Sequence, residues 1–473
     1  MKRTGAAVLL AATLLASTGV TTPAMAQSSA PAPTATGAPR LPVHHIGTHI
    51  GEDDRVRYTV RRGDTLYTLA ADYMHSPLDW RAVQRLNRVR DPLRLLPGST
   101  LIIPAALLKT LPLTARIAAF KGTGTIATGS GAPAAMAVNQ AVTPGMVIEL
   151  GRNSFATLLL SNGSRLTLPS QTRLRVATIR RFQLNDMVDV GFLLEKGRVE
   201  TRATPLGDSG GRYRIRTPIA VSAVRGTTFR AAYEGEGAPS LTEVIDGTVA
   251  VSAGTDASAQ AITRGFGVTV SPQGAMSGEP LLAAPELLNP GRVQTDPQIT
   301  FALQPLQGAT GYHVQIARDA GFVEMEQEGY SRDPLLRFED IGNGRWFVRV
   351  SALAATGLEG MPQTYAMRRV LIGLSASSDR SEDGGYRFRW TTVGEGRDLY
   401  HFRLRRDEPA SPPLVDETGL TDTLISLSDL PPGKYRWSVG VQHFEDGEGT
   451  TSWLPEETLI VANEKGSART GAR

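Results

Sequence analysis

From residue 113 to residue 462, apolar and polar residues alternate in short runs, and glycine-bearing turns separate the runs. Alternation at period two places every second side chain on the same face of an extended strand, which is typical of half-buried β-structure. The chain has 473 residues, 49 of them glycine. This length corresponds to roughly three or four domains of about 100–200 residues each. The pattern therefore predicts a multidomain, mainly β protein.

The N-terminus reads as an export signal. Lys2 and Arg3 precede an apolar run at residues 6–15 that is too short to span a bilayer, and Ala24-Met25-Ala26 supplies the small residues that a signal peptidase recognises. We therefore expect residues 1–26 to be a cleaved signal peptide and the mature chain to be periplasmic, with an uncleaved membrane anchor as the alternative. We expect no transmembrane span elsewhere, because no other stretch is long and apolar enough.

The chain contains no cysteine. Disulfides, thiolate nucleophiles and cysteine-ligated metals are therefore excluded, and so is a cysteine-linked lipid, so we do not expect a lipoprotein. Residues 27–54 are rich in Ala, Pro, Ser and Thr and are predicted to be a flexible linker. His44, His45 and His49 in this linker have a spacing that can touch a metal, or they are incidental in a solvated tether. Residues 463–473 are polar and predicted to be a disordered tail.

Residues 55–105 carry the most specific motif of the chain. Apolar residues recur at helical spacing over 66–73 and 80–87, and short β-type runs flank them at 58–60 and 101–104. Asp64 is placed to cap the first helix. This βααβ order resembles the LysM family. The residues that carry the resemblance are Tyr58-Thr59-Val60, Gly63-Asp64-Thr65-Leu66, Asn87, Leu95, Pro97-Gly98 and Leu101-Ile102-Ile103-Pro104.

The LysM resemblance implies binding of glycans that contain N-acetylglucosamine, in bacteria most often peptidoglycan. The implied groove lies between the loop after the first strand and the loop before the second. The glycan-binding residues carried over are Gly63, Asp64, Thr65, Leu66, Asp91, Pro92, Leu93, Arg94 and Leu95. Backbone donors at the helix start can bind acetamido groups, and Leu66 and Leu93 can contact sugar faces. Structural alternatives remain: Asp64 as a helix cap alone, and Leu66 and Leu95 as core residues.

The same segment is basic, with nine arginines against four aspartates between residues 55 and 104. Such a run is usual for a solvated helical surface. It also suits attraction to the carboxylates of peptide stems or to other anionic envelope polymers. We do not expect nucleic acid as a partner of an exported chain.

Residues 113–279 are predicted to form an all-β domain. Asn162-Gly163 is a strong signal for a two-residue hairpin turn with positive φ at both positions, and Lys196-Gly197 and Asp246-Gly247 are predicted to join strands in the same manner. Thr217-Pro218, followed by Arg225-Gly226-Thr227-Thr228-Phe229, resembles the FecR family. The resemblance implies a periplasmic domain of the kind that senses transporters and controls a sigma factor across the membrane.

We expect no cytoplasmic regulatory domain and no membrane helix of the kind that this family's sensors carry, so direct sigma-factor control is not the expected role. The FecR-like region is therefore expected to be a docking surface for envelope proteins that the sequence does not identify. Arg225 and Phe229 are candidate docking residues. Alternatively, Gly226 makes a tight bend and Phe229 belongs to the core.

The C-terminal part contains an internal repeat. An offset of 89 residues separates Phe301 from Trp390 and Gly344 from Gly433. Alternating strands with one inward aromatic residue each suit two packed sheets. The repeats resemble fibronectin type III-like domains, at residues 284–372 and 373–462, and predict two β-sandwiches. Trp346, Trp390 and Trp437 are expected in their cores, with carbohydrate stacking as the alternative.

Together these features predict a non-catalytic periplasmic envelope protein that binds peptidoglycan and uses its β-domains for protein interaction, with no cofactor and no metal. One alternative is a FecR-type envelope sensor in signal transduction. Another is a peptidoglycan hydrolase targeted by the LysM segment. The sequence disfavours the hydrolase because it has no cysteine and, outside the linker, no histidine with a partner at zinc-ligand spacing. A pair of glycosidase carboxylates is not excluded.

Overall fold

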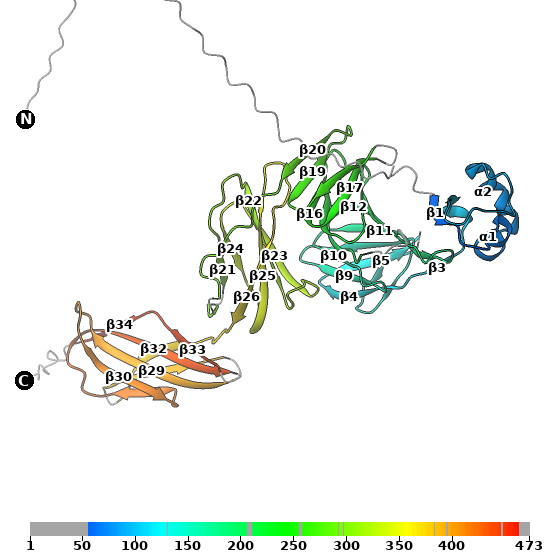
Figure 1. The fold of residues 1–473 in the computed structure, drawn as a ribbon. Helices are drawn as coiled ribbons and strands as arrows, with labels where there is room; N and C mark the ends of the chain where they lie inside the picture. The colour runs from blue at the N-terminus through cyan, green and yellow to red at the C-terminus, as the bar shows by residue number, and fades with distance from the viewer. Residues whose placement is uncertain are drawn as a thin grey trace, which may run out of the picture. The chain divides into compact units, whose positions relative to one another are not determined.

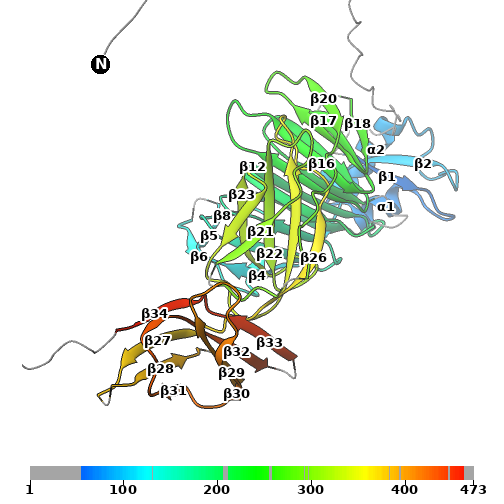
Figure 2. The ribbon, with the colours of Figure 1, turned by 90° about the vertical axis from the view of Figure 1, so that its left-hand side faces the viewer.

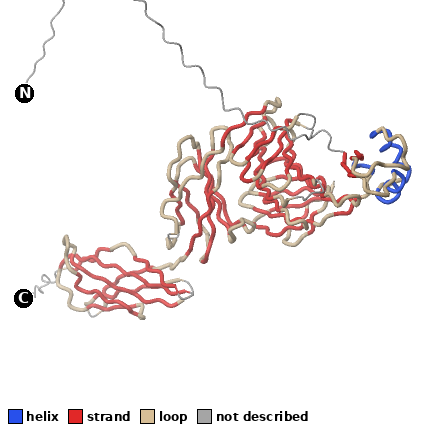
Figure 3. Tube along the Cα trace, viewed as in Figure 1, coloured by secondary structure: helices blue, strands red, loops and turns tan. Residues whose placement is uncertain are grey.

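The computed structural model describes residues 55–462 apart from 130, 206–210, 255–257, 292, 297, 383, 394–395 and 446–447. The expected signal peptide, linker and tail lie outside the described residues. Helices occur between residues 66 and 107, and the rest of the described chain is strand and loop (Figure 3). None of the described helices is long and apolar enough to cross a bilayer. The protein is mainly β, as the alternation predicts.

The N-terminal module has the expected βααβ order (Figure 1). Strands β1 and β2 pair antiparallel, with Val56 opposite Ile103. Both side chains are fully buried, together with Leu69 and Val83 from the two helices. The helices therefore cover one face of a two-stranded sheet. The elements are β1 (Arg55–Thr59), α1 (Leu66–Tyr73), the 3₁₀ turn η2 (Pro77–Asp79), α2 (Trp80–Asn87) and β2 (Thr100–Pro104).

The segment that follows the module is built into the next domain. After the 3₁₀ turn η3 (Ala105–Leu107), strand β3 (Thr110–Pro112) pairs with β11 (Arg173–Phe182). Phe182 and the nearby Leu184 and Met187 are buried in the same hydrophobic cluster as the helices of the module. The small module therefore completes its core with side chains from the β-domain.

Strands β3 to β20 form a closed barrel. Its core is an apolar cluster to which nearly every strand contributes inward-facing residues. The remaining strands are β4 (Ala115–Lys121), β5 (Gly124–Thr128), β6 (Ala134–Ala135), β7 (Ala141–Val142), β8 (Met146–Leu150), β9 (Phe155–Leu160), β10 (Arg165–Leu168), β12 (Val188–Arg202), β13 (Arg212–Arg216), β14 (Ala220–Val224), β15 (Thr228–Tyr233), β16 (Ser240–Asp246), β17 (Thr248–Ala253), β18 (Gln260–Thr263), β19 (Phe266–Val270) and β20 (Met276–Pro280).

Three dipeptides in this domain do not form the two-residue hairpin turns that the sequence predicts. At Asn162-Gly163 only Gly163 has a positive φ, and its N–H donates to the Leu160 carbonyl, so the β9–β10 loop is longer than two residues. Lys196-Gly197 lies inside β12, which bends at Gly197 from pairing with β11 and β13 to pairing with β15. A Cβ on Gly197 would lie 2.7 Å from the Cα of Thr172. Gly247 turns the chain between β16 and β17, which do not pair with each other.

The C-terminal repeat forms two pairs of sheets. In the first repeat, β21 pairs with β24, and a four-stranded sheet runs β23-β22-β25-β26 (Figure 2). The buried ring of Trp346 belongs to its core. The strands are β21 (Ile299–Ala302), β22 (Gly311–Ala317), β23 (Met325–Ser331), β24 (Leu335–Phe338), β25 (Gly344–Leu353) and β26 (Gln363–Arg369).

In the second repeat, a three-stranded sheet runs β27-β28-β31, and a five-stranded sheet is centred on β29 and β32. Trp390 and Trp437 are buried in its core, so the core prediction for the three tryptophans is confirmed. Strands β25 and β32 begin at Gly344 and Gly433, which retains the 89-residue offset. The strands are β27 (Ser375–Arg380), β28 (Tyr386–Thr391), β29 (Arg397–Arg406), β30 (Pro413–Leu420), β31 (Leu424–Leu427), β32 (Gly433–Glu445), β33 (Glu448–Trp453) and β34 (Glu457–Val461).

Candidate functional site

The first candidate loop connects β1 to α1. The Val60 N–H donates to the Ser99 carbonyl and the Val60 carbonyl accepts from the Gly98 N–H, which fixes the start of the loop against the turn before β2. Gly63 has a φ of +96°, and a Cβ placed on it would have open space around it. The glycine is therefore needed for its backbone conformation, and the loop surface at this point is free.

Asp64 stabilises the loop and is not the helix cap, so that expectation was wrong. Its Oδ2 accepts hydrogen bonds from the Tyr58 hydroxyl at 2.8 Å and from the Arg61 N–H at 2.7 Å. Burial, and then the Asp64 carboxylate, raise the pKa of Tyr58 to about 12. The N-cap is Thr65, whose hydroxyl accepts from the Thr68 N–H at 3.0 Å. Thr65 is one residue closer to the helix than Asp64, so its side chain reaches this N–H.

Leu66 joins the two loops through its backbone, and its side chain lies in the core. Its N–H donates to the Pro92 carbonyl at 2.9 Å, which links the first loop directly to the second. The side chain is 0% exposed. The expected contact of Leu66 with a sugar face is therefore wrong, because the first apolar position of α1 is needed to close the small core.

The second candidate loop connects α2 to β2. Oδ1 of Asp91 accepts from the Leu93 N–H at 2.9 Å, and the Asp91 carbonyl accepts from the Arg94 N–H. This turn leaves Leu93 62% exposed, with Asp91 and Arg94 also exposed. Pro92 is half-buried, and Leu95 packs partly against the core. Leu93, like Leu96 at 75% exposed, is therefore an apolar residue of this loop that is available to a ligand.

A partly exposed aromatic pair, Tyr67 and the half-buried Trp80, lies beside the first loop and was missed by the sequence analysis. The rings of Tyr67 and Trp80 lie 4.5 Å apart between centroids, and Tyr67 is 41% exposed. Arg81 lies over the Trp80 ring. Each aromatic residue occupies the first turn of its helix, so a comparison of the two helix starts could have found the pair. Aromatic surface of this kind suits contact with sugar rings.

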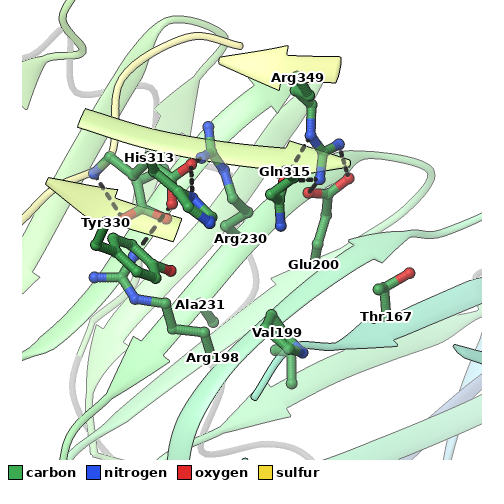
Figure 4. Close-up of a pocket in the computed structure, with 13 residues that line it drawn as sticks. Thr167, Arg198, Val199, Glu200, Arg230, Ala231, His313, Gln315, Tyr330 and Arg349 are labelled. Atoms are coloured by element: carbon green, nitrogen blue, oxygen red, sulfur yellow. Dashed lines mark hydrogen bonds and ion pairs between the residues drawn. The ribbon is translucent and has the colours of Figure 1, made fainter. Parts of the chain in front are cut away.

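A second region of interest is a charged joint between the barrel and the first sandwich (Figure 4). It surrounds a small cavity of about 20 Å³. The joint consists of charged and polar side chains from β12, β15, β16, β22, β23 and β25 and from the loop after β25, and we call this set the ionic joint. Its members are Arg198, Glu200, Arg230, Glu243, His313, Gln315, Glu328, Tyr330, Arg349, Ser351 and Glu359.

Glu359 is the centre of the ionic joint. Its carboxylate pairs with Arg230 and Arg198 of the barrel, and it accepts from Ser351 at 2.5 Å. The His313 Nδ1 lies 3.0 Å from Oε1 of Glu359. Burial by itself would raise the pKa of Glu359, but Arg230, His313 and Arg198 outweigh burial and hold this pKa well below its usual range. The carboxylate is therefore charged and fully compensated.

Further pairs extend the joint across the same interface. The guanidinium of Arg349 binds both carboxylate oxygens of Glu200, at 2.8 and 2.7 Å. Glu328 lies 3.3 Å from Nε2 of His313 and accepts the Ser170 N–H of the barrel. Burial would lower the pKa of His313, but Glu359 and Glu328 outweigh burial and raise it. Most charges of the joint are thus paired across the interface, whereas Nε of Arg230 and Oε2 of Glu243 have no hydrogen-bond partner among the described residues. We interpret the joint as structural.

The two FecR-like candidate docking residues separate in the structure. Phe229 is fully buried in the barrel core, whereas Arg225 is exposed. Gly226 has a φ of +106°, and a Cβ on it would lie 2.8 Å from the Cα of Pro205. The structural alternative is therefore confirmed for Gly226 and Phe229, and Phe229 is not available to a partner.

Comparison with protein families assigns two segments of the chain. Residues 58–104 match the LysM domain. Residues 146–250 match the FecR protein family. The LysM match contains both candidate loops, and the FecR match contains Arg225 and Phe229. LysM indicates glycan binding, and FecR indicates a role in the cell envelope. No curated protein matches the chain significantly.

Solved structures resemble the chain weakly. A candidate anti-sigma factor of Parabacteroides distasonis ATCC 8503 is 20% identical, over 28% of this chain and 59% of that chain, with a TM-score of 0.24. The chain thus spans less than two thirds of that protein. A two-domain fibronectin type III segment of chicken tenascin is 13% identical, over 38% of this chain and 99% of that chain, with a TM-score of 0.20. At these scores, neither likeness supports a conclusion about function.

Proposed function

We propose that this protein is an exported, non-catalytic component of the bacterial cell envelope that binds peptidoglycan through its LysM module. The observation that carries the proposal is the pair of loops at residues 61–66 and 91–95, which lie inside the LysM match and are joined by the hydrogen bond from Leu66 to Pro92. Leu93 offers an exposed apolar contact in the second loop, and the surface at Gly63 in the first loop is open. Apolar contact with a few convergent polar groups is the usual composition of a sugar site.

The proposal keeps seven of the nine glycan-binding residues, which lie at or near the surface: Gly63, Asp64, Thr65, Asp91, Pro92, Leu93 and Arg94. Leu66 contributes through its backbone. Leu95 supports the loop from the core side. The barrel and the two sandwiches are proposed to meet envelope proteins, and the exported chain is proposed to be periplasmic.

Co-sedimentation of the full chain with purified peptidoglycan sacculi tests this proposal. We expect the wild-type chain to sediment with sacculi and Leu93→Ser to bind about three- to tenfold more weakly, since burying a leucine side chain is worth about 1.5–3 kcal/mol and a groove covers only part of it. Leu414→Ser is a matched control, because Leu414 is 53% exposed on the second sandwich. Equal binding of both variants would reject the groove.

Point substitutions are preferable to removal of the module. A chain that begins at Leu113 would expose Phe182, Leu184 and Met187, which pack against the module, and would add nonspecific adhesion to the measurement. The same incubation tests the non-catalytic assignment. We expect no soluble muropeptides in the supernatant, and release that increases with protein concentration would instead support a hydrolase.

The FecR match supports one alternative function, an envelope sensor that reports to a transcriptional regulator. This alternative predicts that deletion of the gene changes transcription of envelope genes. It also predicts that the change persists in a strain that produces the Leu93→Ser protein at normal levels. An anchoring or scaffolding role predicts no such change. RNA sequencing of the deletion strain and the complemented strain separates the two.

A further inference from the structure

The arginines around the two LysM loops lack ion-pair partners. Arg61 and Arg62 lie in the first loop, and Arg90 and Arg94 flank Asp91 in the second. All four side chains are exposed, and none makes a hydrogen bond or an ion pair within the described part of the chain. Because the Leu66–Pro92 hydrogen bond joins the loops, the four arginines stand on or next to two adjacent loops.

Several arginines of the β-domains, unlike the loop set, have a carboxylate partner. On the barrel, Arg173 and Arg175 share Glu195. On the second sandwich, Arg405 pairs with Glu456, and Arg436 pairs with Asp407. The β-domains thus place a carboxylate beside these cations, whereas the LysM loops do not.

The two aspartates of the loops form no ion pair with these arginines in the described part of the chain. Oδ2 of Asp64 is occupied by the Tyr58 hydroxyl and the Arg61 N–H, and Oδ1 of Asp91 is occupied by the Leu93 N–H. Both carboxylates are bound to backbone or hydroxyl donors of their own loop. Over residues 61–66 and 90–95 the sequence has four arginines against two aspartates, so the surface keeps a net positive charge.

We propose that the LysM groove of this protein selects glycans that carry free carboxylates, such as peptide-substituted peptidoglycan, over neutral N-acetylglucosamine polymers. The inference rests on the proposed function and specifies its ligand. Exposed like charges repel one another, and their compensation by a ligand is favourable. Guanidinium groups bind carboxylates in a bidentate, planar geometry, and exposed Leu93 supplies apolar contact between them.

The test compares the full wild-type chain with two variants. In the first, Arg61, Arg62, Arg90 and Arg94 are all replaced by glutamine. In the second, the control, Arg152→Gln and Arg264→Gln remove two exposed barrel arginines that form no ion pair in the described structure. Circular dichroism checks that each variant is folded. The probes are native sacculi, sacculi whose carboxylates have been amidated with carbodiimide and ethanolamine, and chitin.

We expect the loop variant to bind native sacculi about tenfold more weakly than the wild type, and the control to bind as the wild type does. Wild-type binding to native sacculi should fall when the ionic strength rises from about 0.05 M to about 0.5 M, whereas binding to chitin should not. Amidated sacculi should bind wild type and loop variant equally.

Other outcomes overturn the inference in distinguishable ways. If the wild type binds amidated sacculi or chitin as tightly as native sacculi, or if the loop variant matches the control, carboxylate selection is wrong while the proposed function stands. If hydrogen fluoride treatment, which removes phosphodiester-linked polymers, abolishes binding to sacculi, the partner of the arginines is phosphate and the inference is also wrong. If the wild type binds none of these probes, the proposed function itself fails.

Discussion

Glu359→Ala is expected to destabilise the ionic joint by about 3–5 kcal/mol, the usual cost of removing one partner from a buried ion pair. The carboxylate of Glu359 is 3% exposed and compensates Arg230, Arg198 and His313 together. Its removal leaves these cations buried without a counter-charge. The barrel and the first sandwich are therefore expected to separate or to loosen at a lower temperature than the rest of the protein.

Hydrogen exchange gives a local measurement of this effect. The Ser170 N–H donates across the joint to Glu328, and the Glu359 N–H donates to Glu243. Peptides that contain these amides should exchange faster in the variant, while peptides of the second sandwich should be unchanged. Glu243→Gln is the matched control. Burial raises the pKa of Glu243, and its Oε2 has no hydrogen-bond partner among the described residues, so loss of its charge should cost little.

The same joint should depend on pH in both directions. The pKa of His313 is raised above its ordinary value of 6.5, so its stabilisation is complete below that value and is lost as pH rises through the folded pKa. The pKa of Glu359 is lowered below its ordinary value of 4.5, so its stabilisation is complete above that value and is lost as pH falls. Protection of the joint amides from hydrogen exchange should be highest between pH 4.5 and pH 6.5. His313→Gln should remove the loss of protection at higher pH. A flat pH profile, or unchanged exchange in Glu359→Ala, would contradict this account of the joint.

Asn87→Ala is expected to destabilise the LysM module by about 2–4 kcal/mol, since each unsatisfied buried polar group costs about 1–3 kcal/mol. The Asn87 amide donates to the Val83 carbonyl at 2.8 Å and to the Ile102 carbonyl at 2.7 Å. Its carbonyl oxygen accepts from the Ile102 N–H at 2.7 Å. One side chain thus connects the end of α2 to the middle of β2 through three hydrogen bonds.

Thermal unfolding and binding together measure the effect of Asn87→Ala. In the variant, the LysM module should unfold at a lower temperature and retention on sacculi should be lost. The unfolding transition of the barrel should be unchanged. Gln84→Ala is the control, because the Gln84 side chain makes one hydrogen bond, to the Val89 carbonyl at 3.1 Å. If Asn87→Ala and Gln84→Ala unfold alike, the Asn87 bridge does not hold the module together.

Much of the LysM module could be predicted from the sequence. The helices at 66–73 and 80–87 and the flanking strands follow from local apolar spacing, and each element is short enough for its neighbours in sequence to determine it. The details of the site were less predictable. Thr65 and Asp64 are both good capping residues, and only the position of Tyr58 in the folded strand gives Asp64 a different partner.

The barrel shows the limits of local patterns more clearly. The dipeptide Lys196-Gly197 has the composition of a turn, yet β12 continues through it because partners on both sides hold the strand. The positive φ of Gly197 serves a bend and a close approach to Thr172. A glycine signals a special backbone conformation, and tertiary contacts decide whether that conformation is a turn or a bend.

By itself, the sequence determined the mainly β architecture, the LysM and FecR resemblances, the repeat and the buried tryptophans, because periodicity and motif spacing are local properties of the chain. Only the tertiary structure decided that Leu66 is buried, that Phe182 completes the core of the LysM module and that Glu359 compensates charges of the barrel. Arg349 and Glu200 are 149 residues apart and meet in one ion pair. Such contacts depend on which surfaces pack together, and no local pattern of residues encodes that choice.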